Sequence, residues 1–147
     1  MILTHRNGAS FYQFESLVRF PEIRHGIFTR HFGNSPVPFD SLNVSSGLGD
    51  AAAHVKHNRQ IVARAIGSND LIYMQQVHGD QVLTLTSEKG ISDGDRHRIL
   101  GSGDALITDQ AGKCLMIQLA DCQSIMLYDG TRQVVANIHC GWRGSII

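Results

Sequence analysis

The sequence predicts an α/β domain in which a covered β-sheet is combined with one long helix. Three observations lead to this prediction. A chain of 147 residues that is 42% hydrophobic can bury one real core, a single segment has helical periodicity, and many short apolar runs have the length of strands. Thirteen basic and thirteen acidic residues balance without a run of either sign. We therefore expect one domain over residues 1–147 and no nucleic-acid partner, because binding nucleic acid requires a basic stripe.

Cysteine usage and the length of the apolar runs indicate the compartment. The three cysteines form no CxxC pair, and their odd number fits a reducing compartment better than a secreted protein. The apolar runs are far shorter than the roughly 20 residues that span a bilayer. The first residues lack the long apolar region of a signal peptide. We expect a cytoplasmic protein without a membrane partner.

Short strands and a long loop are predicted before the helix. Residues 11–20 and 24–30 have the composition of strands, and Pro21 separates them. Residues 34–49 are rich in Gly, Ser, Pro and Asn, which is typical of a long ordered loop.

The helix is predicted from Ala51 to about Ile66. Asp50 has the side chain of an N-cap, and Gly67 follows the last periodic residue, where helices commonly end. One face carries Val55, Val62 and Ile66, whereas Lys56, Arg59 and Gln60 lie largely off it. We expect the apolar face to pack against the core.

Six further strands are predicted in the second half of the chain. They are Leu71–Val77, Gln81–Leu85, Asp104–Thr108, Cys114–Leu119, Ser124–Tyr128 and Gln133–Ile138. Short turns join the last four, which favours antiparallel pairing. Several runs are continuously apolar, which predicts a sheet covered on both faces. The polar segment 87–103 is predicted to be a mobile loop.

Three side chains of the metal-ligand type stand at the ends of predicted strands: His78, Cys122 and His139. Two imidazole nitrogens and one thiolate suit a tetrahedral zinc ion with an open fourth position, the arrangement of catalytic zinc sites. Zinc in such a site acidifies a water molecule or polarises a substrate atom. The same residues also suit a metal-free cysteine hydrolase, with Cys122 as nucleophile, His139 or His78 as base and Asp121 as the orienting group.

Other side chains of these types have structural explanations. We expect Cys114 to be a core residue and Cys140, directly after His139, to pack on the opposite face of its strand. His54 and His57 on the helix fit a solvated face. The segment 141–145 has two interpretations that the residues leave open. Either backbone N–H groups and Arg143 bind an anion there, or the segment is a structural turn anchored in the core by Trp142.

Four motifs in order give the sequence a family resemblance: Gln76–Gly79, Gly103–Gln110, Ala120–Cys122 and His139–Gly144. With residues 28–30, 41–43 and 49–59, they resemble the YfiH-type laccase-domain family over nearly the whole chain. That family was labelled multicopper polyphenol oxidase. It is now regarded as zinc-dependent purine nucleoside phosphorylase with adenosine deaminase side activity.

The resemblance implies a fold, a cofactor and a site. The fold is a layered mixed β-sheet with flanking helices, also likened to the catalytic domain of cytotoxic necrotising toxins. The resemblance implies that the catalytic residues and zinc ligands are His78, Cys122 and His139. It also implies that substrate or phosphate binds near Asn43 and Arg143. A purine nucleoside and phosphate are the implied substrates. Family chains continue well beyond Gly144, so we expect residues 1–147 to be a single domain of this type without its C-terminal part.

Two functions other than phosphorolysis and cysteine hydrolysis also stay open. Two histidines and a cysteine resemble the ligands of a blue-copper site, which would fit a copper-dependent polyphenol oxidase. However, a multicopper enzyme uses paired H-x-H motifs, and the sequence has none. A non-catalytic domain is the other alternative. An incomplete sheet would leave an unpaired edge, which favours binding a partner or assembling as a homo-oligomer.

Overall fold

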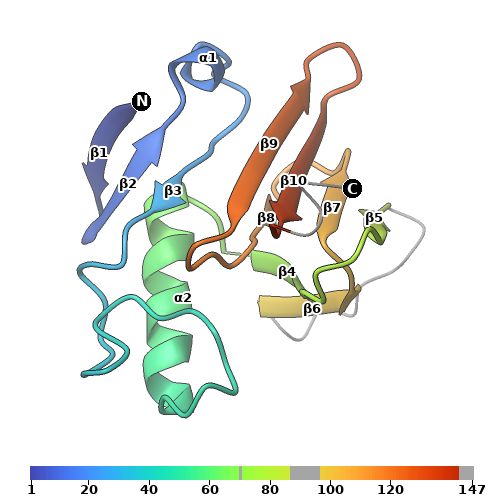
Figure 1. Ribbon diagram of the computed structural model, residues 1–147. Helices are drawn as coiled ribbons and strands as arrows, with labels where there is room; N and C mark the ends of the chain where they lie inside the picture. Colours follow the sequence, from blue (N-terminus) through green and yellow to red (C-terminus); the bar gives the residue numbers. More distant parts are fainter. Residues whose placement is uncertain (70, 87–96, 143–147) are drawn as a thin grey trace. The chain divides into compact units, whose positions relative to one another are not determined.

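The structure is a computed structural model that describes residues 1–69, 71–86 and 97–142 (Figure 1). It contains several sheets and few helices, which confirms the predicted mixed α/β class. The backbone contacts group the chain into two compact units, residues 1–69 and residues 70–147. A single domain over the whole chain stays a prediction. Within the described ranges, no helix is long and apolar enough to cross a membrane.

The first unit contains an antiparallel sheet in the order β1-β2-β3 (Figure 1). The strands are β1 (Ile2–Arg6), β2 (Ala9–Gln13) and β3 (Ile27–Phe28). Strand β1 was not predicted from the sequence, although Asn7 and Gly8 both have the positive φ of a tight hairpin turn. The predicted strand 11–20 ends early because a short helix, α1 (Glu15–Val18), follows β2. The predicted strand 24–30 shrinks to β3.

Helix α2 (Ala52–Ile66) ends where the sequence predicted but begins differently. Gly67 adopts the left-handed conformation (φ 75°), and its N–H donates to carbonyl groups of the last turn. The N-cap residue is Ala51, which has no capping side chain, so the prediction that Asp50 caps the helix is wrong. The reason is that the carboxylate of Asp50 accepts hydrogen bonds from the preceding loop instead.

The apolar face of α2 packs against β2, as predicted. Val55, Val62 and Ile66 are buried, and Phe11 of β2 is fully buried beside Phe28, with ring centroids 4.9 Å apart. Arg59 corrects the prediction, because it is buried rather than solvated. Its Nε donates a hydrogen bond of 2.9 Å to the carbonyl of Val44, so the long loop covers it.

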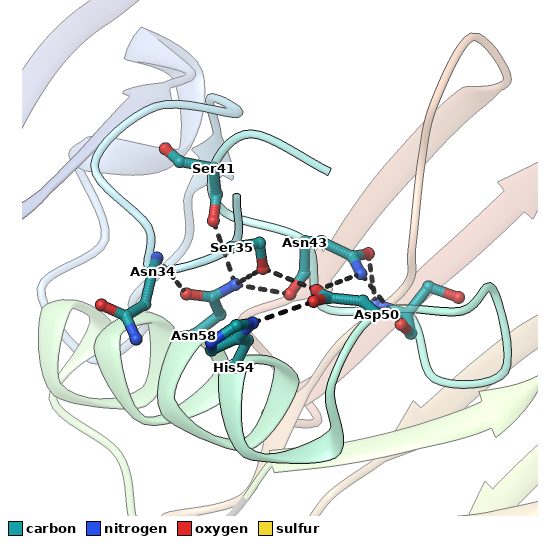
Figure 2. Close-up of polar contacts among 8 residues, drawn as sticks. Asn34, Ser35, Ser41, Asn43, Asp50, His54 and Asn58 are labelled. Atoms are coloured by element: carbon teal, nitrogen blue, oxygen red, sulfur yellow. Dashed lines mark hydrogen bonds and ion pairs between the residues drawn. The ribbon is translucent and has the colours of Figure 1, made fainter. Parts of the chain in front are cut away.

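One buried amide, that of Asn58 on α2, holds the loop of residues 34–49 against the helix (Figure 2). Its Nδ2 donates to Ser35 Oγ and to the carbonyls of Ser41 and Asn43, at 2.9, 3.1 and 2.7 Å. Its Oδ1 accepts from the N–H of Asn34 at 2.7 Å. The loop has no helix or strand, as predicted, and these bonds replace the ones that secondary structure would supply.

A second polar centre in the same loop is the carboxylate of Asp50 (Figure 2). It accepts hydrogen bonds from Ser35 Oγ (2.6 Å), Asn43 Nδ2 (2.9 Å) and His54 Nδ1 (3.1 Å), and its side chain is 2% exposed. The hydrogen bond from Ser35 is the main reason that the pKa of Asp50 falls to about 2. His54 is therefore engaged with Asp50, and the prediction of a purely solvated histidine there is wrong.

Within its described residues, the second unit contains two sheets (Figure 1). One has the order β5-β7-β10-β9, from β5 (Val82–Leu85), β7 (Ala105–Thr108), β10 (Val134–Cys140) and β9 (Gln123–Asp129). The other has the order β6-β4-β8, from β6 (His97–Ser102), β4 (Leu71–Gln75) and β8 (Cys114–Leu115). Strands β9 and β10 pair antiparallel, as the short turn between them predicted. Strand β7 also pairs antiparallel, but with β10 rather than with β8, the next strand along the chain. The predicted antiparallel pairing of β8 with its sequence neighbours is wrong, because β8 pairs in parallel with β4. The pairs β5–β7, β4–β6 and β4–β8 are parallel, so pairing is mixed.

Two sequence predictions need correction in this unit. Residues 97–102 form β6 rather than loop, whereas residues 87–96 of the predicted loop lie outside the described ranges. Burial on both faces holds for β4, whose residues 71–74 are all buried, but not for β9. There, Ile125 and Leu127 are 44% and 55% exposed. Strand β9 stands at the end of its sheet order, and antiparallel strands commonly leave one face uncovered. Cys114, expected in the core, is half-buried.

Replacing Asn58 by alanine should destabilise the protein by about 2–4 kcal/mol, because buried N–H and C=O groups of the 34–49 loop lose their partner. The loss is measured as the change in the free energy of unfolding in urea. Lys56→Ala, on the exposed side of the same helix, serves as the control and should change it by less than about 0.5 kcal/mol. Equal losses in the two variants would contradict the role of Asn58.

Replacing Asp50 by asparagine should change how stability depends on pH. Because folding lowers the pKa of Asp50 from 3.8 to about 2, its ionised form stabilises the protein above about pH 4, and this contribution disappears as the pH falls toward 2. Urea unfolding should therefore find the variant less stable than the wild type at pH 5–7, with the difference closing near pH 2. A difference that persists at pH 2 would assign the effect to packing.

Candidate metal centre

Three residues that the sequence singled out meet in the second unit. His78, Cys122 and His139 each offer a ligand atom, and these atoms all lie within 4.8 Å of one another. His78 is exposed, Cys122 half-buried and His139 buried. The three therefore form a small cluster that is open on the side of His78.

The antiparallel pairing of β9 and β10 brings Cys122 and His139 together. His139 is the next-to-last residue of β10 and pairs with Ser124 of β9, and Cys140 pairs with Gln123. Cys122 directly precedes β9, so it stands at the same end of the hairpin as His139. Only a register of this kind places a residue before one strand next to the last residues of the other.

His78 reaches the cluster from the turn after β4. Its backbone has a φ of 57°, in the left-handed region that residues other than glycine seldom adopt. Its ring meets that of His139 edge to face, with centroids 4.8 Å apart and planes at 82°. The side chain of Gln76 ties this turn to the segment before Cys122, because Nε2 donates to the carbonyl of Gln118 (2.9 Å) and Oε1 accepts from its N–H (2.7 Å).

Asp104, which the sequence analysis did not assign to the site, lies behind both histidines. Its Oδ1 accepts from Nδ1 of His139 at 2.8 Å and from the N–H of His78 at 3.0 Å. Its Oδ2 accepts from the N–H groups of Gly79 and Val77 at 2.7 and 3.3 Å. Asp104 is 3% exposed. A signal was available, since Asp104 belongs to the motif 103–110, but only tertiary structure shows what it contacts.

The hydrogen bonds around Asp104 outweigh the effect of its burial. Burial raises the pKa of this carboxyl group. The hydrogen bonds from Gly79, His139, His78 and Val77 lower the pKa by more than burial raises it. The pKa of Asp104 is therefore below its usual value. At neutral pH, Asp104 is therefore a carboxylate that can only accept hydrogen bonds.

Gly141 lets the ring of His78 lie against the backbone after β10. A Cβ atom at position 141 would stand 2.5 Å from Nδ1 of His78 and 3.3 Å from Cε1. No side chain fits at that distance without moving the imidazole. The glycine that follows His139-Cys140 in the sequence thus has a steric reason that concerns the site.

The remaining predicted site residues lie elsewhere or outside the described ranges. Asn43 belongs to the first unit, where its amide bonds to Asp50 and to the backbone of Ser45. Arg143 lies outside the described residues. The roles of both in binding substrate stay predictions. Cys140 is half-buried, and Trp142 is 69% exposed, so the interpretation of Trp142 as a core anchor is wrong.

The donor set of the cluster fits zinc. Zinc binds imidazole nitrogen at about 2.0–2.1 Å and thiolate at about 2.3 Å, so tetrahedral ligand atoms lie about 3.3–3.6 Å apart. The ligand atoms of the three residues all lie within 4.8 Å of one another, which is close to this spacing. Among the described residues, these three form a group of His, Cys, Asp or Glu side chains close enough together to hold an ion. Three protein ligands would leave the fourth position of a tetrahedral zinc ion open.

The model of the family described as multi-copper polyphenol oxidoreductase laccase matches residues 24–147. The chain belongs to this family. The chain is also similar in sequence to two relatives named purine nucleoside phosphorylase. The one from Bacteroides thetaiotaomicron is 32% identical over an alignment 142 residues long, and the match covers 90% of this chain and 50% of the relative. The one from Mycobacterium bovis is 34% identical over 125 residues, which are 84% of this chain and 47% of the relative.

Two solved structures also resemble the chain. The hypothetical protein YfiH of Bacillus licheniformis has a TM-score of 0.78 and 27% identity, and the match covers 97% of this chain and 53% of that one. YlmD of Geobacillus stearothermophilus has a TM-score of 0.78 and 29% identity, with the same coverage. These matches confirm the resemblance and the fold. The chain spans about half the length of the relatives that it matches.

Replacing Gly141 by alanine should weaken metal binding at this cluster about 10- to 100-fold, because the new Cβ displaces the ring of His78. Zn²⁺ affinity is measured by competition with a chromophoric chelator. Gly130→Ala is the matched control, since a Cβ there meets Tyr128 at an ordinary 3.5 Å. Unchanged affinity in the Gly141 variant would show that His78 does not bind the metal in this position.

Proposed function

We propose that the protein acts as a zinc-dependent purine nucleoside phosphorylase that cleaves adenosine and inosine with phosphate, with adenosine deaminase activity at the same site. The observation that carries this proposal is the convergence of His78, Cys122 and His139, three ligands that would leave the fourth position of a tetrahedral zinc ion open. The chain belongs to a family in which its relatives are named purine nucleoside phosphorylase. A nucleoside, phosphate and zinc are thus the proposed substrates and cofactor.

His78, Cys122 and His139 would hold the metal. When bound, zinc with an open position supplies a Lewis acid and lowers the pKa of a water molecule. In phosphorolysis, a phosphate oxygen bonds to C1′ of the ribose while the bond from C1′ to the base breaks, and the departing base takes up a proton. We assign the phosphate to Arg143, whose planar guanidinium pairs with phosphate oxygens.

Asn43 would contribute through the loop that it shapes. Its amide donates to Asp50 and to the carbonyl of Ser45, and it accepts from the N–H of Ser45. Its own carbonyl accepts from Asn58. With these groups engaged, we expect a change at Asn43 to act on nucleoside binding by altering the loop of residues 34–49.

A metal-free cysteine hydrolase is the alternative with a specific observation in its favour. The imidazole of His139 is held by a buried carboxylate, as in catalytic triads that use a cysteine. That carboxylate is Asp104, so the assignment of Asp121 as the orienting group is wrong. Asp121 is exposed, and its Oδ1 lies 4.0 Å from Sγ of Cys122. Alkylation of Cys122 by iodoacetamide, with hydrolase activity that survives chelation of zinc, would favour this function.

A copper-dependent polyphenol oxidase has the description of the family model in its favour. A two-histidine, one-cysteine set resembles a blue-copper site, but such sites are trigonal with a weak axial ligand. The sequence also lacks paired H-x-H motifs. Stoichiometric copper with a visible absorption band would support this oxidase.

Replacing Cys122 by alanine should remove zinc and phosphorylase activity together. Wild-type protein is expected to carry about one zinc ion per chain and to release adenine from adenosine only when phosphate is present. Metal analysis and chromatographic detection of adenine are the measurements. We expect the activity of Cys122→Ala to fall at least about 100-fold, as removal of a ligand should affect a metal site more than loss of its supporting groups does. Cys114→Ala, at a half-buried cysteine of β8, is the control and should retain both. Wild-type phosphorylase activity in Cys122→Ala would contradict the proposal.

A further inference from the structure

The buried carboxylate of Asp104 contacts the two histidines in different ways. It accepts from the ring of His139 and from the backbone of the turn that carries His78. Asp104 and His139 have side chains that are 4% and 3% exposed, so water does not compete for these bonds. One side chain thus acts on two of the proposed ligands at once.

The contact between Asp104 and His139 determines which ring nitrogen of His139 has a lone pair available for a metal. Nδ1 of His139 lies 2.8 Å from Oδ1 of Asp104. A carboxylate has no proton to offer, so Nδ1 must carry the proton and donate it. In the neutral imidazole, the lone pair then lies on Nε2. The backbone of His139 is fixed to the same residue, because its N–H donates to the carbonyl of Asp104 at 2.8 Å.

The contact with the turn decides where His78 stands. The N–H groups of Val77, His78 and Gly79 all point at the carboxylate, at distances of 3.3, 3.0 and 2.7 Å. Successive N–H groups around a left-handed residue form a concave site for an anion. The φ of 57° at His78 is strained, and such strain persists when surrounding contacts determine it. The carboxylate supplies these contacts.

We propose that Asp104 is the positioning residue of the metal centre, holding His139 with Nε2 as the ligand atom and holding the left-handed turn that presents His78. This inference rests on the proposed metal-dependent function, because it assigns the two histidines as ligands. It adds that the centre is arranged before the metal arrives. Metal ligands of the histidine type commonly donate their other N–H to such a carboxylate, which fixes their orientation.

Asparagine at position 104 separates positioning from simple packing, because it keeps the shape and loses one acceptor. An amide has one oxygen and one NH₂ group, whereas the four donors around Asp104 need an acceptor on both sides. If the NH₂ group faces His139, the ring must reverse its tautomer. If it faces the turn, it meets the N–H groups of Val77 and Gly79. Either arrangement disturbs one histidine.

The first experiment needs no variant and no metal. In ¹⁵N-labelled, metal-free wild-type protein at about pH 8, where an ordinary imidazole is neutral, long-range ¹H–¹⁵N spectra report the tautomer of each histidine. His139 is assigned by comparison with His139→Gln. We expect His139 to carry its proton on Nδ1. A proton on Nε2 would overturn the proposal.

The second experiment compares Asp104→Asn with Asp109→Asn, a matched change at the exposed aspartate that follows the same strand, β7. For Asp104→Asn, we expect Zn²⁺ affinity to fall about 10- to 100-fold. We also expect a shift of the Co²⁺ absorption bands and displaced amide resonances of residues 77–79. Asp109→Asn should match the wild type in all three. A Co²⁺ spectrum, Zn²⁺ affinity and 77–79 resonances that stay at wild-type values in Asp104→Asn would also overturn the proposal.

The two proposals fail separately. If wild-type protein binds no zinc, the proposed function fails, while the tautomer of His139 and the resonances of the 77–79 turn still test Asp104. If wild-type protein binds zinc and Asp104→Asn keeps the wild-type Zn²⁺ affinity, Co²⁺ spectrum and 77–79 resonances, the positioning role falls and the proposed function is unaffected. Phosphorylase activity is not needed to decide between these results.

Discussion

The buried carboxylate of Asp104 is the constraint on which the candidate centre depends. A charge that is 3% exposed is tolerable only when hydrogen bonds replace the water it has lost. The donors that do this are the N–H groups of residues 77–79 and Nδ1 of His139. The requirement to satisfy one anion therefore brings together a turn after β4 and the end of β10, which are far apart in the sequence.

The first unit is organised by the same physical requirement. The loop of residues 34–49 has no helix or strand to satisfy its backbone groups, and the buried amide of Asn58 takes over that task for several of them. Asp50 adds a second acceptor within the loop. In both units, a buried polar side chain on or beside a regular element holds an irregular segment in one shape. Such networks determine a single conformation because a half-satisfied one is unstable.

The sequence predicted the features that neighbouring residues determine, and it failed where contacts between distant residues determine the structure. Helix α2 and the cores of β4, β7, β9 and β10 were predicted, because local periodicity and the glycine at position 67 report them directly. Strand β6 was not predicted, because it pairs in parallel with β4 and is not joined to its partner by a short turn that the sequence would reveal. The N-cap was misassigned because Asp50 has stronger partners in the loop. The residue types at strand ends predicted His78, Cys122 and His139 as ligands. Asp104 lies in the 103–110 motif, but only the folded structure shows that it contacts both histidines.

The position of His78 helps to decide what the centre is for. Asp104, His139 and Cys122 alone have the donor types of a cysteine-hydrolase triad, in which one imidazole takes the proton of the thiol. A second imidazole has no task in that chemistry. Here it is nevertheless held in a strained left-handed turn, edge to face with the first and over a glycine that leaves it room. Strain of this kind is retained where a function needs the geometry. A metal ion uses both imidazoles and the thiolate together, so the arrangement of His78 favours metal binding over a triad.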